Sequence, residues 1–262
     1  ISQPIQFRFR TYVGLEPKID ERIKIYGIDD KTFAKMNSWV LTTNLWAKIF
    51  KNIAKSKPKA IMVDAVFSKI IDPDNKLQEA LKTFSEIDVP IVVGAFASAK
   101  KLKYRVPLDQ SRDDYKISNK FVTDPGEKFE NSLPPMIDAR DHYLYGPAVG
   151  LFDSFKHVGH LLYSIPGRVA GLIRTDENTM IPHMSFFAAD TINIENRRLN
   201  LNGFDVPLDN SGYLVPNFRA RSAYYSKTRA MYKVIKNSIN GKTIKRIKEG
   251  DIVYIIPLLY TG

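Results

Sequence analysis

Residues 22–67, RIKIYGIDDKTFAKMNSWVLTTNLWAKIFKNIAKSKPKAIMVDAVF, decide the fold because they read as strand, helix and strand. The first apolar run ends at Asp29 and Asp30, a helical pattern follows, and a second apolar run, residues 60–63, ends at Asp64. We predict that the second strand extends over residues 60–67. If the two strands are parallel neighbours, their carboxyl ends and all three aspartates lie at one edge of the sheet. Open α/β sheets place their ligand sites at such an edge. We therefore expect the rest of the chain to fold around this stretch.

The same alternation continues to residue 96. Residues 76–87 repeat apolar side chains at helical spacing, and residues 90–96 form a third strand of the buried type. This βαβαβ order predicts right-handed crossovers and a parallel sheet. Residues 97–135 then lose all periodicity, which is typical of a loop or a cap inserted into a domain.

The second half of the chain predicts hairpins added to that sheet. Pro166-Gly167 joins residues 158–165 to residues 168–174, and Asn202-Gly203 favours the type I′ turn of a second hairpin. The remaining predicted elements are helices at residues 148–155, 184–191 and 230–239, an edge strand at 213–218 and a last strand at 251–256. The predicted fold class is α/β, three-layer, with a mainly parallel central sheet and appended β-hairpins. We expect residues 1–262 to form a single domain.

The composition limits the classes of function. The chain has no cysteine, which excludes disulfides, thiolate metal sites and a cysteine nucleophile. Its net charge of +11 is compatible with nucleic acid, an anionic membrane surface or an anionic ligand. The basic stretch, residues 219–248, carries ten Lys or Arg residues and no acid. This stretch is either a solvated surface or a site for lipid headgroups or another anion, and we expect no nucleic-acid partner.

The two ends of the chain indicate a fragment. The sequence begins at Ile1 rather than Met, and its last strand runs into Gly262 without a polar tail. No apolar run approaches the roughly 20 residues that cross a bilayer. We therefore expect a piece excised from a longer protein, with residues 1–18 as its membrane-proximal segment.

Common catalytic signatures are absent from the sequence. There is no Gly-x-Gly-x-x-Gly or Gly-x-Ser-x-Gly motif, and Gly241-Lys-Thr243 lacks the earlier glycine of a phosphate-binding loop. His157 and His160 are three residues apart, so a strand would send them to opposite faces, and we expect no histidine metal site. The sequence predicts neither a cofactor nor a metal.

Asp29, Asp30 and Asp64 are the candidate ligand-binding residues. Their carboxylates could coordinate a hard cation, or accept hydrogen bonds from the hydroxyl or amine groups of a ligand. The alternative is structural, because an aspartate at a strand end often caps the next helix or binds loop amides. Trp39, in the connecting loop, could line the same pocket or cover the core. Asp72-Pro73-Asp74 is also typical of a helix start.

Residues 25–30, Trp39 and residues 60–67 carry a resemblance to a known family. The other segments that match in order are Asp74, residues 158–160, residues 207–212 and residues 250–256. Together they resemble the type two CHASE domain, the cyclase/histidine-kinase-associated sensing extracellular domain. The family usually has Trp-Pro followed by Arg, whereas Val40 follows Trp39 and residues 40–44 contain no arginine. If that arginine binds the ligand in relatives, this chain binds something else.

The resemblance implies a sensor without catalysis of its own. It implies the periplasmic or extracellular part of a bacterial inner membrane protein, with a membrane helix before Ile1 and membrane helices after Gly262. It also implies a cytoplasmic output domain such as a nucleotide cyclase or a kinase. We expect a small-molecule or peptide ligand and a homodimer. Two alternatives remain: a secreted metal-dependent phosphoester hydrolase that uses the same carboxylates, and a basic module that binds anions or membrane surfaces.

Overall fold

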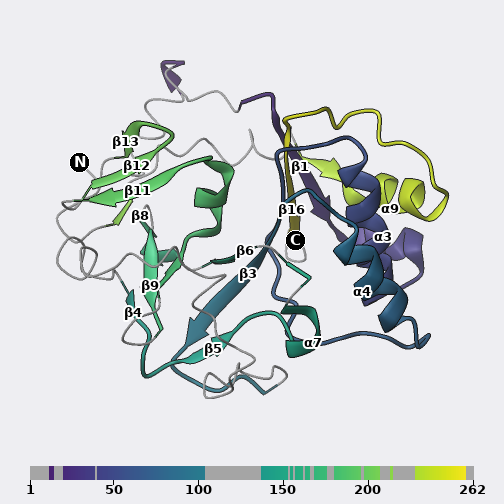
Figure 1. Ribbon diagram of the computed structural model, residues 1–262, viewed down its shortest axis with the longest axis horizontal. Helices are drawn as coiled ribbons and strands as arrows, with labels where there is room; N and C mark the ends of the chain where they lie inside the picture. The colour runs from purple at the N-terminus through teal and green to yellow at the C-terminus, as the bar shows by residue number, and fades with distance from the viewer. Residues whose placement is uncertain are drawn as a thin grey trace.

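The centre of the fold is a seven-stranded sheet in the order β15-β1-β16-β2-β3-β5, in which β6 also pairs with β3 (Figure 1). The structure is a computed structural model, and it describes residues 12–14, 20–38, 40–103, 137–152, 154–155, 157–161, 163–165, 168–175, 180–195, 198–206, 213–214 and 228–257. The strands of this sheet are β1 (Ile23–Ile28), β2 (Ala60–Val63), β3 (Ile91–Ser98), β5 (Tyr143–Tyr145), β6 (His157–His160), β15 (Arg229–Ala230) and β16 (Ile252–Pro257). Only β5 runs antiparallel to its neighbour.

The last strand of the sheet lies between the first two. β16 pairs with β1 in parallel from Ile23↔Ile252 to Ile28↔Pro257, and it pairs with β2 on its other side. β1 and β2 are therefore parallel, as the sequence predicts, but they are not neighbours. β16 can occupy the position between them because it is apolar enough to be covered on both faces. It comes from the far end of the chain, so the neighbouring residues of β1 and β2 do not indicate this pairing.

Four helices cover one face of the sheet: α2 (Asp30–Met36), α3 (Thr43–Ala54), α4 (Leu77–Ser85) and α9 (Met231–Ile239) (Figure 1). α3 begins where the Thr42 side chain accepts a hydrogen bond from the Leu45 amide at 3.2 Å. It then turns Ile49, Phe50 and Ile53 inwards, all three fully buried. This spacing confirms the helix predicted from the sequence.

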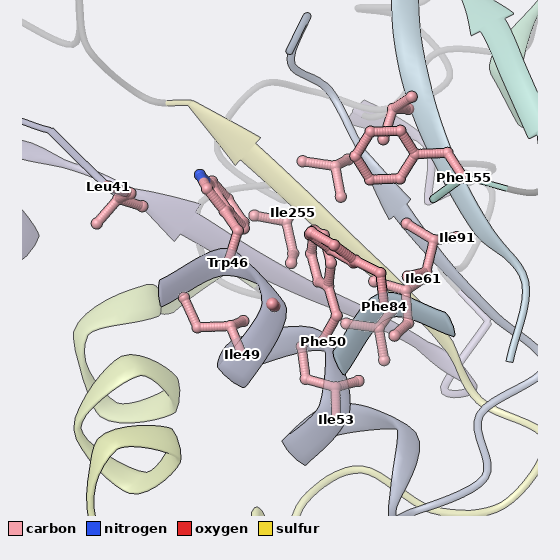
Figure 2. Packing of buried hydrophobic residues seen from close by; sticks show 14 of the residues in the cluster. Leu41, Trp46, Ile49, Phe50, Ile53, Ile61, Phe84, Ile91, Phe155 and Ile255 are labelled. Carbon is pink, nitrogen blue, oxygen red and sulfur yellow. The ribbon is translucent and has the colours of Figure 1, made fainter. Parts of the chain in front are cut away.

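An aromatic cluster joins these helices to the sheet (Figure 2). The Phe50 ring lies 5.2 Å from the Trp46 ring and 6.0 Å from the Phe84 ring, measured between centroids. Phe67 completes the cluster, 5.3 Å from Trp46 and 5.2 Å from Phe155. The predicted strand 60–67 consequently ends at Val63, because the chain leaves the ladder and turns Phe67 into this cluster.

The opposite face of the sheet is covered by a 3₁₀ helix, η2 (Met184–Ala188), where the sequence predicts a helix at residues 184–191. Met184 packs against Ala60, Met62 and Val92 in a second core cluster. Gly159 permits this close approach, because a Cβ atom there would lie 2.3 Å from the Met184 Cα atom. In the described part of the chain, this short 3₁₀ helix lies where many α/β folds have a second layer of α-helices.

Three small sheets, of three strands each, carry the hairpins. They comprise β4 (Ile137–Asp138), β7 (Tyr163–Ile165), β8 (Arg168–Ala170), β9 (Leu172–Arg174), β10 (Met180–Pro182), β11 (Ile192–Glu195), β12 (Arg198–Leu201), β13 (Phe204–Val206) and β14 (Tyr213–Leu214). Asn202 and Gly203 have φ angles of 53° and 83°, which confirms the predicted type I′ turn. β7 and β8 pair as the other predicted hairpin, although the predicted strand 158–165 divides into β6 and β7.

The predicted fold class is confirmed: the chain is mixed α/β, with a mainly parallel central sheet and small hairpin sheets. The predicted helix at residues 148–155 is reduced to α7 (Val149–Phe152). The predicted insertion at residues 97–135 begins later, because Ala97 and Ser98 still pair with β5. Its remainder from residue 104 lies outside the described residues, as does most of the segment 1–18.

Candidate functional site

Asp29 is a helix cap. It follows β1, and its Oδ1 atom accepts hydrogen bonds from the Thr32 amide at 2.8 Å and from the Thr32 hydroxyl at 2.6 Å. Thr32 is itself fully buried, so its hydroxyl depends on this partner. Two of the acceptor positions of the Asp29 carboxylate are therefore already used by α2. Of the two roles open to an aspartate at a strand end, ligand binding or helix capping, the structure shows capping for Asp29.

Asp30 and Trp39 do not define the shape of the site. Asp30 is exposed in the first turn of α2, where a carboxylate interacts favourably with the helix dipole. Trp39 lies outside the described residues. Its part in ligand binding stays a prediction.

Asp64 has a different environment. It follows β2, and its amide donates a hydrogen bond to the Ile255 carbonyl of β16 at 2.9 Å. The side chain is half-buried, and burial raises the pKa of its carboxyl group above the ordinary value. Within the described part of the chain, the Asp64 carboxylate has neither a hydrogen bond nor an ion pair. It is therefore a desolvated acceptor that a ligand could satisfy.

The three aspartates share an edge but do not form one cluster. Because β16 separates β1 from β2, Asp29 and Asp64 are separated by about 10 Å across the strands, which is two strand spacings, and they are also offset along the strands. Among the described residues, no group of three or more His, Asp or Glu side chains is placed to hold a metal ion. Asp72, just beyond β2, accepts hydrogen bonds from the Lys76 and Leu77 amides at 2.6 and 3.0 Å, which is the predicted start of α4.

A basic cavity lies at the border of the sheet formed by β15 and β1, along α9. Its volume is about 800 Å³, and Tyr26 of β1, Val234 of α9 and Ile244 contribute its apolar walls. Five cationic side chains line it: Arg229, Lys233, Lys242, Lys245 and Arg246. None of Asp29, Asp30 and Asp64 lines this cavity. The basic stretch of the sequence is thus partly gathered around one hollow.

Comparison with known proteins identifies the family. The model of the CHASE2 domain matches residues 5–255. The chain belongs to the CHASE2 family. No curated protein and no solved structure matches the chain. The predicted resemblance to the type two CHASE domain is confirmed over nearly the whole length of the chain.

Membership defines the class of function. A CHASE2 domain is a sensor domain of signalling proteins, generally extracytoplasmic, and it is not catalytic. Within the described ranges, no helix of this CHASE2 domain is long and apolar enough to cross a membrane. That residues 1–262 form a single domain stays a prediction.

The CHASE2 domain also contains a buried histidine pair that the sequence does not predict. His160 of β6 and His183, which precedes η2, form a parallel bridge, and their ring centroids are 5.2 Å apart. Burial lowers the pKa of His160 to about 3 and that of His183 to about 4. His157 points elsewhere and stacks on Phe187 at 4.6 Å, as the odd spacing predicts. Only the tertiary bridge between β6 and residue 183 could have revealed the pair.

Proposed function

We propose that this CHASE2 domain is the extracytoplasmic ligand-sensing part of a bacterial membrane-bound signalling protein. In this proposal it relays ligand binding to a cytoplasmic output domain, such as a nucleotide cyclase or a kinase. A homodimer and a small-molecule or peptide ligand belong to the same proposal. The observation that carries it is the half-buried Asp64 carboxylate at the carboxyl end of β2.

The chemistry of Asp64 favours a ligand that donates hydrogen bonds. An ionised carboxylate that is partly removed from water is destabilised unless a donor or a cation compensates it. An ammonium, amide or hydroxyl group of a ligand would supply that donor. Asp30 and Trp39 would line the same edge of the sheet, and the free acceptor positions of Asp29 would add to it.

The position of Asp64 supports a route for the signal. Its amide is bonded to Ile255 of β16, and β16 is paired along its whole length with β1. A ligand that binds one arrangement of this edge better than another shifts the population toward that arrangement. The change would reach the first and last strands of the domain directly.

The site is tested by thermal unfolding of the 262-residue chain with individual amino acids, amines and polyols. We expect at least one of these compounds to raise the midpoint of the wild type and of Asp30→Asn, but not of Asp64→Asn. Asp30→Asn is the matched control because Asp30 is exposed at the same edge. A compound that stabilises Asp64→Asn as much as the wild type would contradict the site. A complete absence of stabilising compounds would contradict the ligand class.

A further inference from the structure

We propose that the basic cavity along α9 is a second ligand site, which binds an organic phosphate or another ligand with several phosphate groups. It goes beyond the site at Asp64, because the two sites share no residue. The cavity is bounded by β1, β15, α9 and the chain segment 241–246, which leads to β16. The charge of this cavity, the rigidity of its wall and its size support the proposal.

Among the residues that the structure describes, nothing neutralises the charge of the cavity. None of the lining residues in this part of the chain is acidic, and none of the five cations makes an ion pair there. Elsewhere in the described chain six cations are paired with acids: Arg22, Lys24, Lys48, Lys51, Lys59 and Arg140. Like charges gathered around one hollow repel each other, and a bound polyanion removes that repulsion. Arg and Lys side chains are also the usual partners of phosphate.

A smaller hollow adjoins the basic cavity, and acidic side chains contribute to its lining. It measures about 270 Å³, shares Tyr26, Arg229 and Arg246 with the basic cavity, and is also lined by Asp20 and Glu21. The Asp20 carboxylate is held by the Arg22 guanidinium at 2.6 Å, so its charge is already compensated. Of the two acids at this border, Asp20 therefore takes little from the positive charge of the basic cavity.

The wall of the cavity is fixed by buried groups. Asn52 of α3, which is 4% exposed, donates hydrogen bonds to the Lys242 carbonyl at 3.0 Å and to the Ser238 hydroxyl at 3.3 Å. Ile244 and Ile247 are buried on the same segment and are joined by a turn. This alternation leaves the basic residues between them exposed at the cavity. A segment held in this way loses little conformational freedom when it binds a ligand.

The size of the cavity excludes a single small anion as its full occupant. Pockets for small molecules typically measure about 300–1,000 Å³, and about 800 Å³ falls well inside that range. The apolar walls at Val234 and Ile244, with the Tyr26 ring, favour an organic body beside the anionic groups. A soluble organic phosphate and a phospholipid headgroup share this chemistry.

Isothermal titration of the 262-residue chain with inorganic tripolyphosphate tests the anion site. We expect the variant Arg229→Gln, Lys245→Gln, Arg246→Gln to bind at least about tenfold more weakly than the wild type, because three charge-assisted contacts are lost. The matched control is Lys55→Gln, Lys69→Gln, Lys100→Gln, which removes the same charge from other exposed positions. We expect this control to bind like the wild type. All six side chains are exposed or at the surface, and circular dichroism confirms that each variant is folded.

Cosedimentation separates the two sources of phosphate. The wild type and both triple variants are mixed with phosphatidylcholine vesicles that contain or lack phosphatidylglycerol. Cavity-dependent binding to the anionic vesicles would assign a lipid headgroup, and cavity-dependent binding to tripolyphosphate alone would assign a soluble phosphate. The proposal is overturned if the cavity variant binds both probes as well as the wild type, or if the control loses as much affinity. It is also overturned if the wild type binds neither probe.

Discussion

His160 and His183 lie edge to face with their ring centroids 5.2 Å apart, at the bridge between β6 and the residue that precedes η2. Both side chains are buried, and desolvation is the main cause that lowers the pKa of each ring. His183 lowers the pKa of His160 further, and a hydrogen bond with the Gly171 backbone opposes the shift. The folded protein therefore keeps both rings neutral at pH values where the unfolded chain would protonate them.

The histidine pair should make the domain less stable in mild acid. The unfolded chain takes up protons below about pH 6.5, whereas the folded pKa values are about 3 and 4. Above about pH 6.5 the two histidines therefore do not reduce the free energy of unfolding. Below that pH the free energy of unfolding falls, by up to about 1.4 kcal/mol per pH unit for each ring. Urea unfolding between pH 7 and pH 5 measures the slope. His160→Gln and His183→Gln should each flatten it, whereas His142→Gln leaves the pair intact and should not.

Asp64 should produce the opposite dependence. Its folded pKa is raised by burial, so the folded state holds the proton more tightly than the unfolded chain. The contribution of Asp64 to stability therefore decreases as the pH rises from about 3.8 through the folded pKa. We expect Asp64→Asn to be more stable than the wild type at neutral pH and to lose that advantage in acid. Urea unfolding of Asp30→Asn measures the effect of removing an exposed carboxylate and serves as the control. If Asp64→Asn were less stable than the wild type at neutral pH, the Asp64 carboxylate would be well solvated.

Asp29 should behave as a cap. Asp29→Ala removes the acceptor for the Thr32 amide and hydroxyl, and we expect a loss of about 1 kcal/mol in the free energy of unfolding. Asp29→Ser should recover most of this loss, because serine is also a good N-cap. The comparison uses chemical unfolding at neutral pH. If Asp29→Ala were as stable as the wild type, the carboxylate would be available for a ligand rather than committed to α2.

Asn52 should control the segment that forms the wall of the basic cavity. Asn52→Ala removes its hydrogen bonds to Lys242 and Ser238 and leaves one part-buried and one buried acceptor without this donor, at a cost of about 1–3 kcal/mol in stability. We also expect faster amide exchange across residues 240–247 and weaker binding of tripolyphosphate. Lys48→Ala, on the exposed side of the same helix, should change neither. Unchanged exchange in Asn52→Ala would mean that Ile244 and Ile247 suffice to hold the segment.

Local patterns in the sequence predict much of the fold. The helical spacing of Leu45, Ile49 and Ile53, a threonine cap at residue 42 or 43 and the turn at Asn202-Gly203 all depend on neighbours within a few residues, and all are found, with the cap at Thr42. The position of β16 depends instead on which strand best covers β1 and β2, and nothing near residues 252–257 indicates it. The same holds for β3, whose one side is shared by β5 and β6.

The candidate site was predictable only in part. An aspartate after a strand gives the same sequence signal whether it caps a helix, as Asp29 does, or remains without a partner among the described residues, as Asp64 does. The sequence alone shows that residues 219–248 are rich in positive charge. Its arrangement around a cavity requires the buried contacts of Asn52 and Ile244, from segments nearly two hundred residues apart.

The parallel register of β1 and β16 has a mechanical consequence. Because the strands are parallel, Ile23 and Pro257 lie at opposite ends of the pair, which is about 20 Å long. Tension applied between these two residues would act along the strands and load all their backbone hydrogen bonds together. An antiparallel pair pulled from one end would instead break its bonds one after another. The centre of this sheet is therefore built as a shear clamp, able to carry force between the two flanks of the domain without peeling apart.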